Sequence, residues 1–106
     1  MQDKILNNPL AGETAASRLK QLALVYIIYH MQVKGIEPSA KNIKEKAGLS
    51  LPGVHEMTGY LIARGLLVEE TVLNAIGRGR ASRFVIPNEV LRSIFDDDDG
   101  PPSVDR

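Results

Sequence analysis

The sequence predicts a mainly α-helical domain with one small β-hairpin, that is, an α+β fold. Apolar residues recur at three- and four-residue steps over residues 14–34, which is the period of a helix. Capping and helix-ending residues bound two shorter helical segments after it, and two runs with strand character flank a loop rich in glycine and arginine. With 106 residues, 43% of them hydrophobic, the chain is long enough for one compact domain with short tails.

The first expected helix, over residues 14–34, begins at a capping residue, Thr14, and ends before Gly35. Both of its faces are apolar, so either the helix is central in the domain or its outer face meets another chain. One face carries Leu19, Leu22, Ala23, Tyr26, His30 and Val33. The opposite face forms an outer stripe that carries Leu24, Ile27, Ile28 and Met31. This stripe is either part of the ordinary core or the interface of a homodimer. In the second case helix 88–95 could belong to the same interface.

Two short helices follow. The first is expected over residues 40–47, with Ser39 as its N-cap and Gly48 as its end. The second is expected over residues 50–64, where Ser50 caps the helix and Pro52 falls in the first turn. Its inner face is expected to hold Val54, Met57, Thr58 and Leu61.

The hairpin is expected from two apolar runs that flank a loop. A strand leads from residue 66 to about residue 73, the loop tip spans residues 77–80, and a second strand covers residues 82–86. Pro87 ends that strand, and a last short helix over residues 88–95 has apolar residues at the spacing of one face.

The ends of the chain are predicted to be loose. Residues 96–106 hold five Asp and one Arg, a net charge of −4, so residues 1–95 hold 12 basic and 8 acidic residues, a net charge of +4. Four consecutive Asp repel one another, which predicts a disordered acidic tail. Residues 1–13 have little periodicity and are expected to form a flexible segment, which leaves residues 14–95 as the folded domain.

Composition excludes several classes of protein. The absence of cysteine excludes a disulfide scaffold, a thiol nucleophile and a cysteine metal site. No nucleophile–base pair, metal set or phosphate loop can be assembled, so we expect no enzyme, no metal and no cofactor. The most apolar run, residues 22–29, is far shorter than the roughly 20 residues of a membrane span, so a cytoplasmic protein without membrane contact is expected.

Two short helices joined by a turn containing glycine are the signature of a helix-turn-helix unit. Here the unit reads SAKNIKEKAGLS over residues 39–50, LPGVHEMTGYL over 51–61 and RGLLV over 64–68. Over residues 15–95 the chain resembles the winged helix-turn-helix superfamily, of the kind seen in MarR-like small bacterial regulators. The resemblance implies a winged fold in which helix 50–64 is the recognition helix.

The resemblance implies binding of double-stranded DNA, sequence-specific or semi-specific, in a transcriptional regulator. Helix 50–64 would enter the major groove, and the wing, residues 74–83, would contact the backbone or the minor groove. The Ser50 cap leaves free backbone N–H groups for a phosphate, and two arginines flank Gly79 in a slim loop. The candidate DNA-binding residues are Lys41, Lys44, Ser50, His55, Tyr60, Arg64, Arg78, Arg80 and Arg83.

A second hypothesis is a winged-helix module that binds protein in a replication, partition or transcription assembly. The expected reading face favours it, because that face has Glu56, two glycines and a proline, and no Lys or Arg at its centre. A further hypothesis concerns the tail. Because the charges of body and tail match, residues 96–99 are a candidate autoinhibitory segment that folds onto the wing and competes with DNA.

Overall fold

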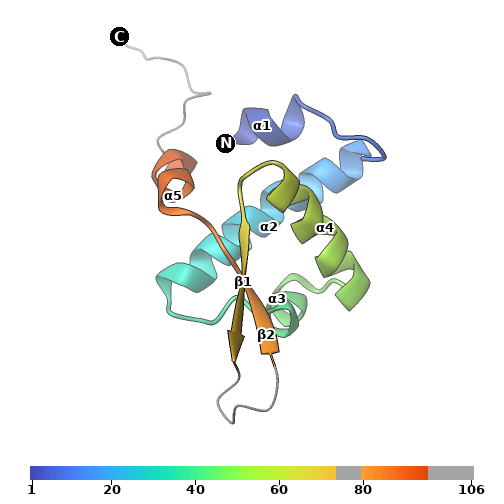
Figure 1. The fold of residues 1–106 in the computed structure, drawn as a ribbon. Coiled ribbons are helices and arrows are strands. Elements are labelled where there is room, and N and C mark those ends of the chain that lie inside the picture. Colours follow the sequence, from blue (N-terminus) through green and yellow to red (C-terminus); the bar gives the residue numbers. More distant parts are fainter. Residues whose placement is uncertain (74–79, 96–106) are drawn as a thin grey trace.

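The computed structural model describes residues 1–73 and 80–95, and within them the chain forms helices and one antiparallel hairpin (Figure 1). The mainly helical α+β class predicted from the sequence is therefore confirmed. In chain order the elements are α1 (Gln2–Leu6), α2 (Ala15–Val33), α3 (Ala40–Ala47), α4 (Leu51–Ala63), β1 (Val68–Leu73), β2 (Arg80–Val85) and α5 (Asn88–Phe95).

Three helices begin at the caps expected from the sequence. In each, the hydroxyl oxygen accepts a hydrogen bond from the backbone N–H three residues later, at 3.0 Å for Thr14, 3.2 Å for Ser39 and 3.1 Å for Ser50. Gly48 ends α3 in the left-handed region, with φ +73°, which glycine adopts without steric cost. Local sequence signals therefore set the ends of these helices.

The hairpin is joined to the helical part through its second strand. β1 and β2 pair antiparallel from Val68 opposite Val85 to Leu73 opposite Arg80. The backbone N–H of Phe84 also donates to the Pro38 carbonyl at 2.9 Å, and an isolated bridge links Ser39 with Arg83. The segment that leads into α3 therefore lies against the outer side of β2 and fixes the hairpin relative to that helix.

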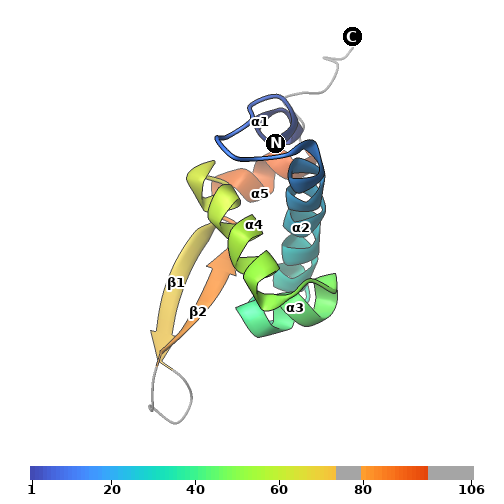
Figure 2. The ribbon, with the colours of Figure 1, turned by 90° about the vertical axis from the view of Figure 1, so that its right-hand side faces the viewer.

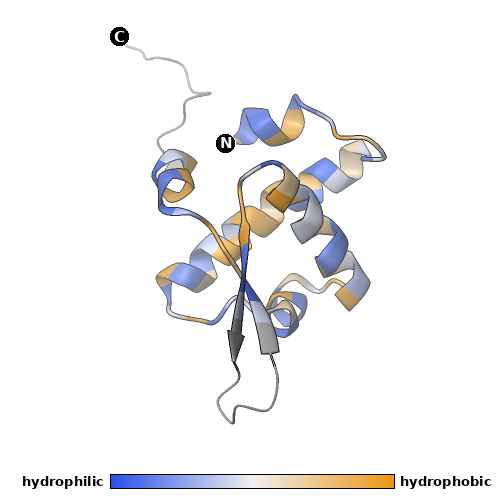
Figure 3. Ribbon diagram, in the orientation of Figure 1, coloured by the Kyte–Doolittle hydropathy of each residue, from blue (hydrophilic) through white to orange (hydrophobic). Residues whose placement is uncertain are grey.

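The core lies where α2, α3 and α4 meet the base of the hairpin. Figure 2 shows α2 and α4 side by side, with α3 at one end and α1 with α5 at the other. Figure 3 shows apolar residues gathered along α2 in the middle of the molecule. Side chains from all five helices, from β2 and from the segment just before β1 are buried there, among them Leu24, Val25, Ile28, Ile43, Val54, Leu61, Leu66, Phe84 and Ile94.

The direction in which α2 faces corrects the sequence interpretation. Leu24, Ile28 and Met31, read as an outer stripe with Ile27, are at most 1% exposed, and Ile27 is half-buried. A homodimer seam made of these residues is therefore wrong, and on helix 88–95 Val90 and Ile94 are buried in the same core. The periodicity marks two apolar faces but does not say which one turns inward.

The start of the chain also differs from the expectation of a flexible segment over 1–13. α1 packs on α2 and buries Ile5 completely, and Met1 is 4% exposed. A helix of five residues is too short to show periodicity in the sequence, so tertiary packing decides its formation. The expected acidic tail, residues 96–106, and the wing tip, residues 74–79, lie outside the described residues.

Candidate nucleic-acid interface

α3, a tight turn and α4 form a compact helix–turn–helix unit. α3 packs against α4, and α4 is anchored on α2 by four buried side chains, as the sequence predicted: Val54, Met57, Thr58 and Leu61. The buried Thr58 hydroxyl donates to the Val54 carbonyl at 2.9 Å, so this polar group is satisfied within its own helix. The unit therefore holds α4 by one face and leaves the opposite face uncovered by other described residues.

The uncovered face of α4 is largely neutral. It holds one acidic side chain, Glu56, and one histidine, His55, both exposed. Two large apolar side chains are also exposed on this helix, Leu51 at 43% and Ile62 at 37%. The His55 ring meets the Phe84 ring edge-on at a centroid distance of 6.5 Å, which places His55 beside the base of the hairpin.

The α3 lysines divide between two flanks of the helix. Lys41 and Lys44 are exposed and, at a spacing of three residues, lie on the same flank. Lys46 lies on another flank, where it lines a hollow with residues of α2. Ser50 is exposed as well, and its hydroxyl oxygen is engaged in the cap of α4.

Arg64 is placed where it cannot reach a nucleic acid. Its side chain is only 3% exposed, and the guanidinium donates to Glu13, to Gln21 and to backbone carbonyls of the N-terminal segment. The Arg64–Glu13 ion pair is buried, unlike the pairs that Arg83 forms with Glu37 and Glu70. The sequence-based assignment of Arg64 to DNA binding is therefore wrong. The guanidinium is bound to the carboxylate of Glu13, a residue that lies 51 positions earlier in the chain.

Arg83 lies on β2 between two carboxylates. Its Nε donates to Glu70 Oε1 at 2.9 Å, and its Nη1 lies 3.5 Å from Glu37 Oε1. These carboxylates, Glu70 first, raise the pKa of the Arg83 guanidinium above its usual value. Its side chain stays 39% exposed, so it is accessible, but its charge is already balanced by its neighbours.

Tyr60 is half-buried and turned toward the N-terminal segment, where its hydroxyl donates to the Gly12 carbonyl at 3.4 Å. Arg80 begins β2, but its side chain, like the whole of Arg78, lies outside the described part of the chain. Of the nine residues that the sequence suggested, Lys41, Lys44, Ser50 and His55 are exposed on the helix–turn–helix unit. Sequence reasoning missed the two acids beside Arg83, although the strand pairing of residues 70 and 83 would have pointed to one of them.

No grouping of three or more potential metal-ligating side chains occurs within residues 1–73 and 80–95. In the same ranges, no helix combines the length and the hydropathy that a membrane crossing requires. No family model matches the chain, and neither curated proteins nor solved structures show significant similarity to it.

Proposed function

We propose that this protein binds double-stranded DNA through a winged helix-turn-helix, as a small transcriptional regulator. In this proposal α4 enters the major groove and the hairpin contacts the flanking backbone or the minor groove. The main support is the arrangement of α4, which is fixed to α2 and α3 by one face and is uncovered on the other. The backbone link between Pro38 and Phe84 supports it further, because it gives the hairpin a defined position beside this unit.

Electrostatics points to a modest affinity that depends on salt. Among the described residues, few basic side chains of the helix–turn–helix unit face solvent. Of these, Lys41 and Lys44 lie on the same flank of α3. Arg64 is buried, Arg83 is balanced by two acids, and α4 itself adds Glu56. Each lysine that neutralises a phosphate steepens the salt dependence of binding by about 0.9 in log K against log salt, so we expect a shallow slope.

The test is a titration of fluorescently labelled random duplex DNA at several salt concentrations, read by anisotropy. Lys44→Ala should weaken binding to all sequences and reduce the salt slope by about 1. Lys46→Ala is the matched control, because it removes the same charge from the same helix but on the flank that faces α2. Arg78→Ala with Arg80→Ala tests the wing in the same assay. If the full chain leaves duplex DNA unbound at low salt, the proposal is refuted.

A second candidate function is a winged-helix module that binds a protein partner in a replication, partition or transcription assembly. The exposed Leu51 and Ile62, at the edge of the uncovered face of α4, favour it, since apolar side chains contribute to protein contacts more than to phosphate contacts. Ile62→Asp separates the two candidates. A DNA-binding α4 would lose affinity for duplex DNA, whereas a protein-binding module would show no DNA affinity to lose.

A further inference from the structure

The outer face of α2 repeats small, apolar or aromatic side chains, and one histidine, with the spacing of a coiled-coil seam. Starting at Leu19, the steps are four, three, four and three residues, through Ala23, Tyr26, His30 and Val33. Leu19 and Val33 are 61% and 66% exposed, the highest values among the exposed large hydrophobic residues of the described chain. This face, which we call the α2 stripe and extend back to Ala16, is opposite the face that α2 buries in the core.

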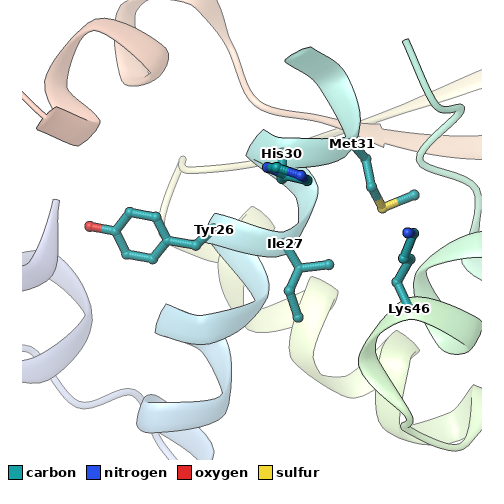
Figure 4. A pocket seen from close by; sticks show the side chains of 5 residues that line it. All are labelled: Tyr26, Ile27, His30, Met31 and Lys46. Carbon is teal, nitrogen blue, oxygen red and sulfur yellow. The ribbon is translucent and has the colours of Figure 1, made fainter. Parts of the chain in front are cut away.

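The α2 stripe is bordered by two hollows. On one side Ile27, Met31 and Lys46 line a hollow of about 330 Å³ between α2 and α3, together with Tyr26 and His30 of the stripe. Figure 4 shows Tyr26 projecting sideways from α2, away from the other four labelled side chains. On the other side Leu91 and Arg92 of α5 line a hollow of about 360 Å³ with Val33 and its neighbours Tyr29 and Gln32. A helix laid on the stripe would find holes for its side chains on both sides.

We propose that the α2 stripe packs against the same stripe of a second copy of this chain, with the two helices antiparallel. In this orientation the α2 stripe is complementary to itself. In an antiparallel pair of heptads, each residue of one repeat position faces a residue of the other position. Here Ala23 faces Tyr26 of the second copy, and Ala16 faces Val33 of the second copy. Leu19 faces His30 of the second copy. In the Ala23–Tyr26 and Ala16–Val33 pairs, a small side chain thus meets a larger one, so the space between the two helices is filled evenly.

A parallel pair of the same helices packs less well. It would stack Ala16, Ala23 and His30 each on its own copy, and it would set Tyr26 against Tyr26 in the neighbouring layer. Pairs of alanines would leave voids between the helices, and pairs of tyrosines would force the helices apart. Both effects weaken an interface. The antiparallel pair also runs along most of α2, which spans about 28 Å for its 19 residues. The dimer does not depend on DNA binding and is proposed for the protein alone.

Sedimentation of the full chain over a range of concentrations tests the dimer. We expect the mass to rise from monomer to dimer with concentration. Leu19→Lys should raise the dissociation constant about a hundredfold or more, because each dimer would bury two ammonium groups opposite His30, which supplies no negative counter-charge. Ala23→Glu is a second variant at the centre of the seam, at an exposed position where a larger side chain does not disturb the monomer. Leu51→Lys is the matched control, an exposed leucine on α4 whose loss should leave the dimer intact.

Each outcome of this experiment decides the proposal. A full chain that stays monomeric at every concentration overturns it, and the α2 stripe would then belong to a different protein partner. A dimer that survives both Leu19→Lys and Ala23→Glu also overturns it, since the contact must then lie elsewhere. Unchanged circular dichroism of the variants shows that dissociation does not result from unfolding.

Disulfide trapping tests the orientation of the two helices, and the absence of native cysteine makes single replacements unambiguous. In the antiparallel pair, Leu19→Cys and His30→Cys should cross-link when the two variants are mixed. Neither should cross-link alone, because each position faces the other. Cross-linking of each variant with itself, without the mixed product, would show a parallel pair and contradict the proposed geometry.

Discussion

Arg64 at the end of α4 and Glu13 before α2 form a two-pronged ion pair, with 2.5 Å between Nη1 and Oε2 and 2.7 Å between Nη2 and Oε1. Both side chains are almost completely buried. The same guanidinium donates to Gln21 Oε1 at 2.6 Å and to the Lys4 and Asn8 carbonyls at 2.8 Å. One side chain therefore joins α1, α2 and α4, and it satisfies backbone carbonyls that α1 leaves open at its C-terminal end.

Loss of this link should destabilise the protein strongly. Arg64→Ala leaves the Glu13 carboxylate buried without its counter-charge, so we expect the free energy of unfolding to fall by about 3–5 kcal/mol. Urea titration followed by circular dichroism measures the change. Arg92→Ala, at an exposed arginine of α5, is the control and should change the stability by less than about 0.5 kcal/mol. A loss of similar size in both variants would contradict the role of Arg64.

The same pair should make stability depend on pH in acid. The Arg64 guanidinium, which donates hydrogen bonds to Glu13, lowers the pKa of that carboxyl from 4.5 to about 2. Because the folded state binds this proton more weakly than the unfolded state, the contribution is fully present above pH 4.5. It is lost as the pH falls from about 4.5 toward 2. Melting temperatures of the wild type and Glu13→Gln over this range give the test, and the difference between them should shrink as the pH falls.

Gly48 and Gly59 should respond in opposite ways to alanine. Gly48 has φ +73°, and a Cβ added there would meet no atom within 4 Å, so Gly48→Ala costs only backbone strain, about 1–2 kcal/mol. Gly59 lies inside α4, also with open space around a Cβ, and Gly59→Ala should stabilise the helix by about 0.5–1 kcal/mol. Thermal unfolding measures both. Equal shifts of the same sign would show that the turn at Gly48 does not need the left-handed conformation.

The acids beside Arg83 should limit the use of that arginine in DNA binding. Glu70→Gln removes the stronger partner of Arg83. If the hairpin contacts DNA as proposed, the freed guanidinium should gain one phosphate contact, and the salt slope should steepen by about 1. Glu69→Gln is the matched control, because it removes the same charge from the neighbouring position, whose side chain is exposed on the other face of β1. Equal effects of both variants would show only the loss of general repulsion.

The parts of the structure that follow from local signals could be predicted. The caps at Thr14, Ser39 and Ser50 and the glycine end of α3 were visible in the sequence, because they depend on residues within four positions. The inner face of α4 was also predictable, since its other face is polar or small enough to indicate a direction. In the candidate interface, the exposure of Lys41 and Lys44 followed from the same reasoning.

The remaining features depend on contacts between distant parts of the chain. α2 has two apolar faces, so only its packing with α3, α4 and β2 decides that Leu24 is buried and Leu19 is exposed. Arg64 could not be recognised as buried, because its partner Glu13 is 51 positions away.

By itself, then, the sequence determined the order and the limits of the main helices and the α+β class, since turn chemistry and helix periodicity act over a few residues. Only the tertiary structure decided which apolar face of α2 is buried, that residues 2–6 form a helix, and that Arg64 is a structural residue. The physical reason is that burial is a property of the whole packed chain, and neither a side chain's type nor its spacing fixes which neighbour will cover it.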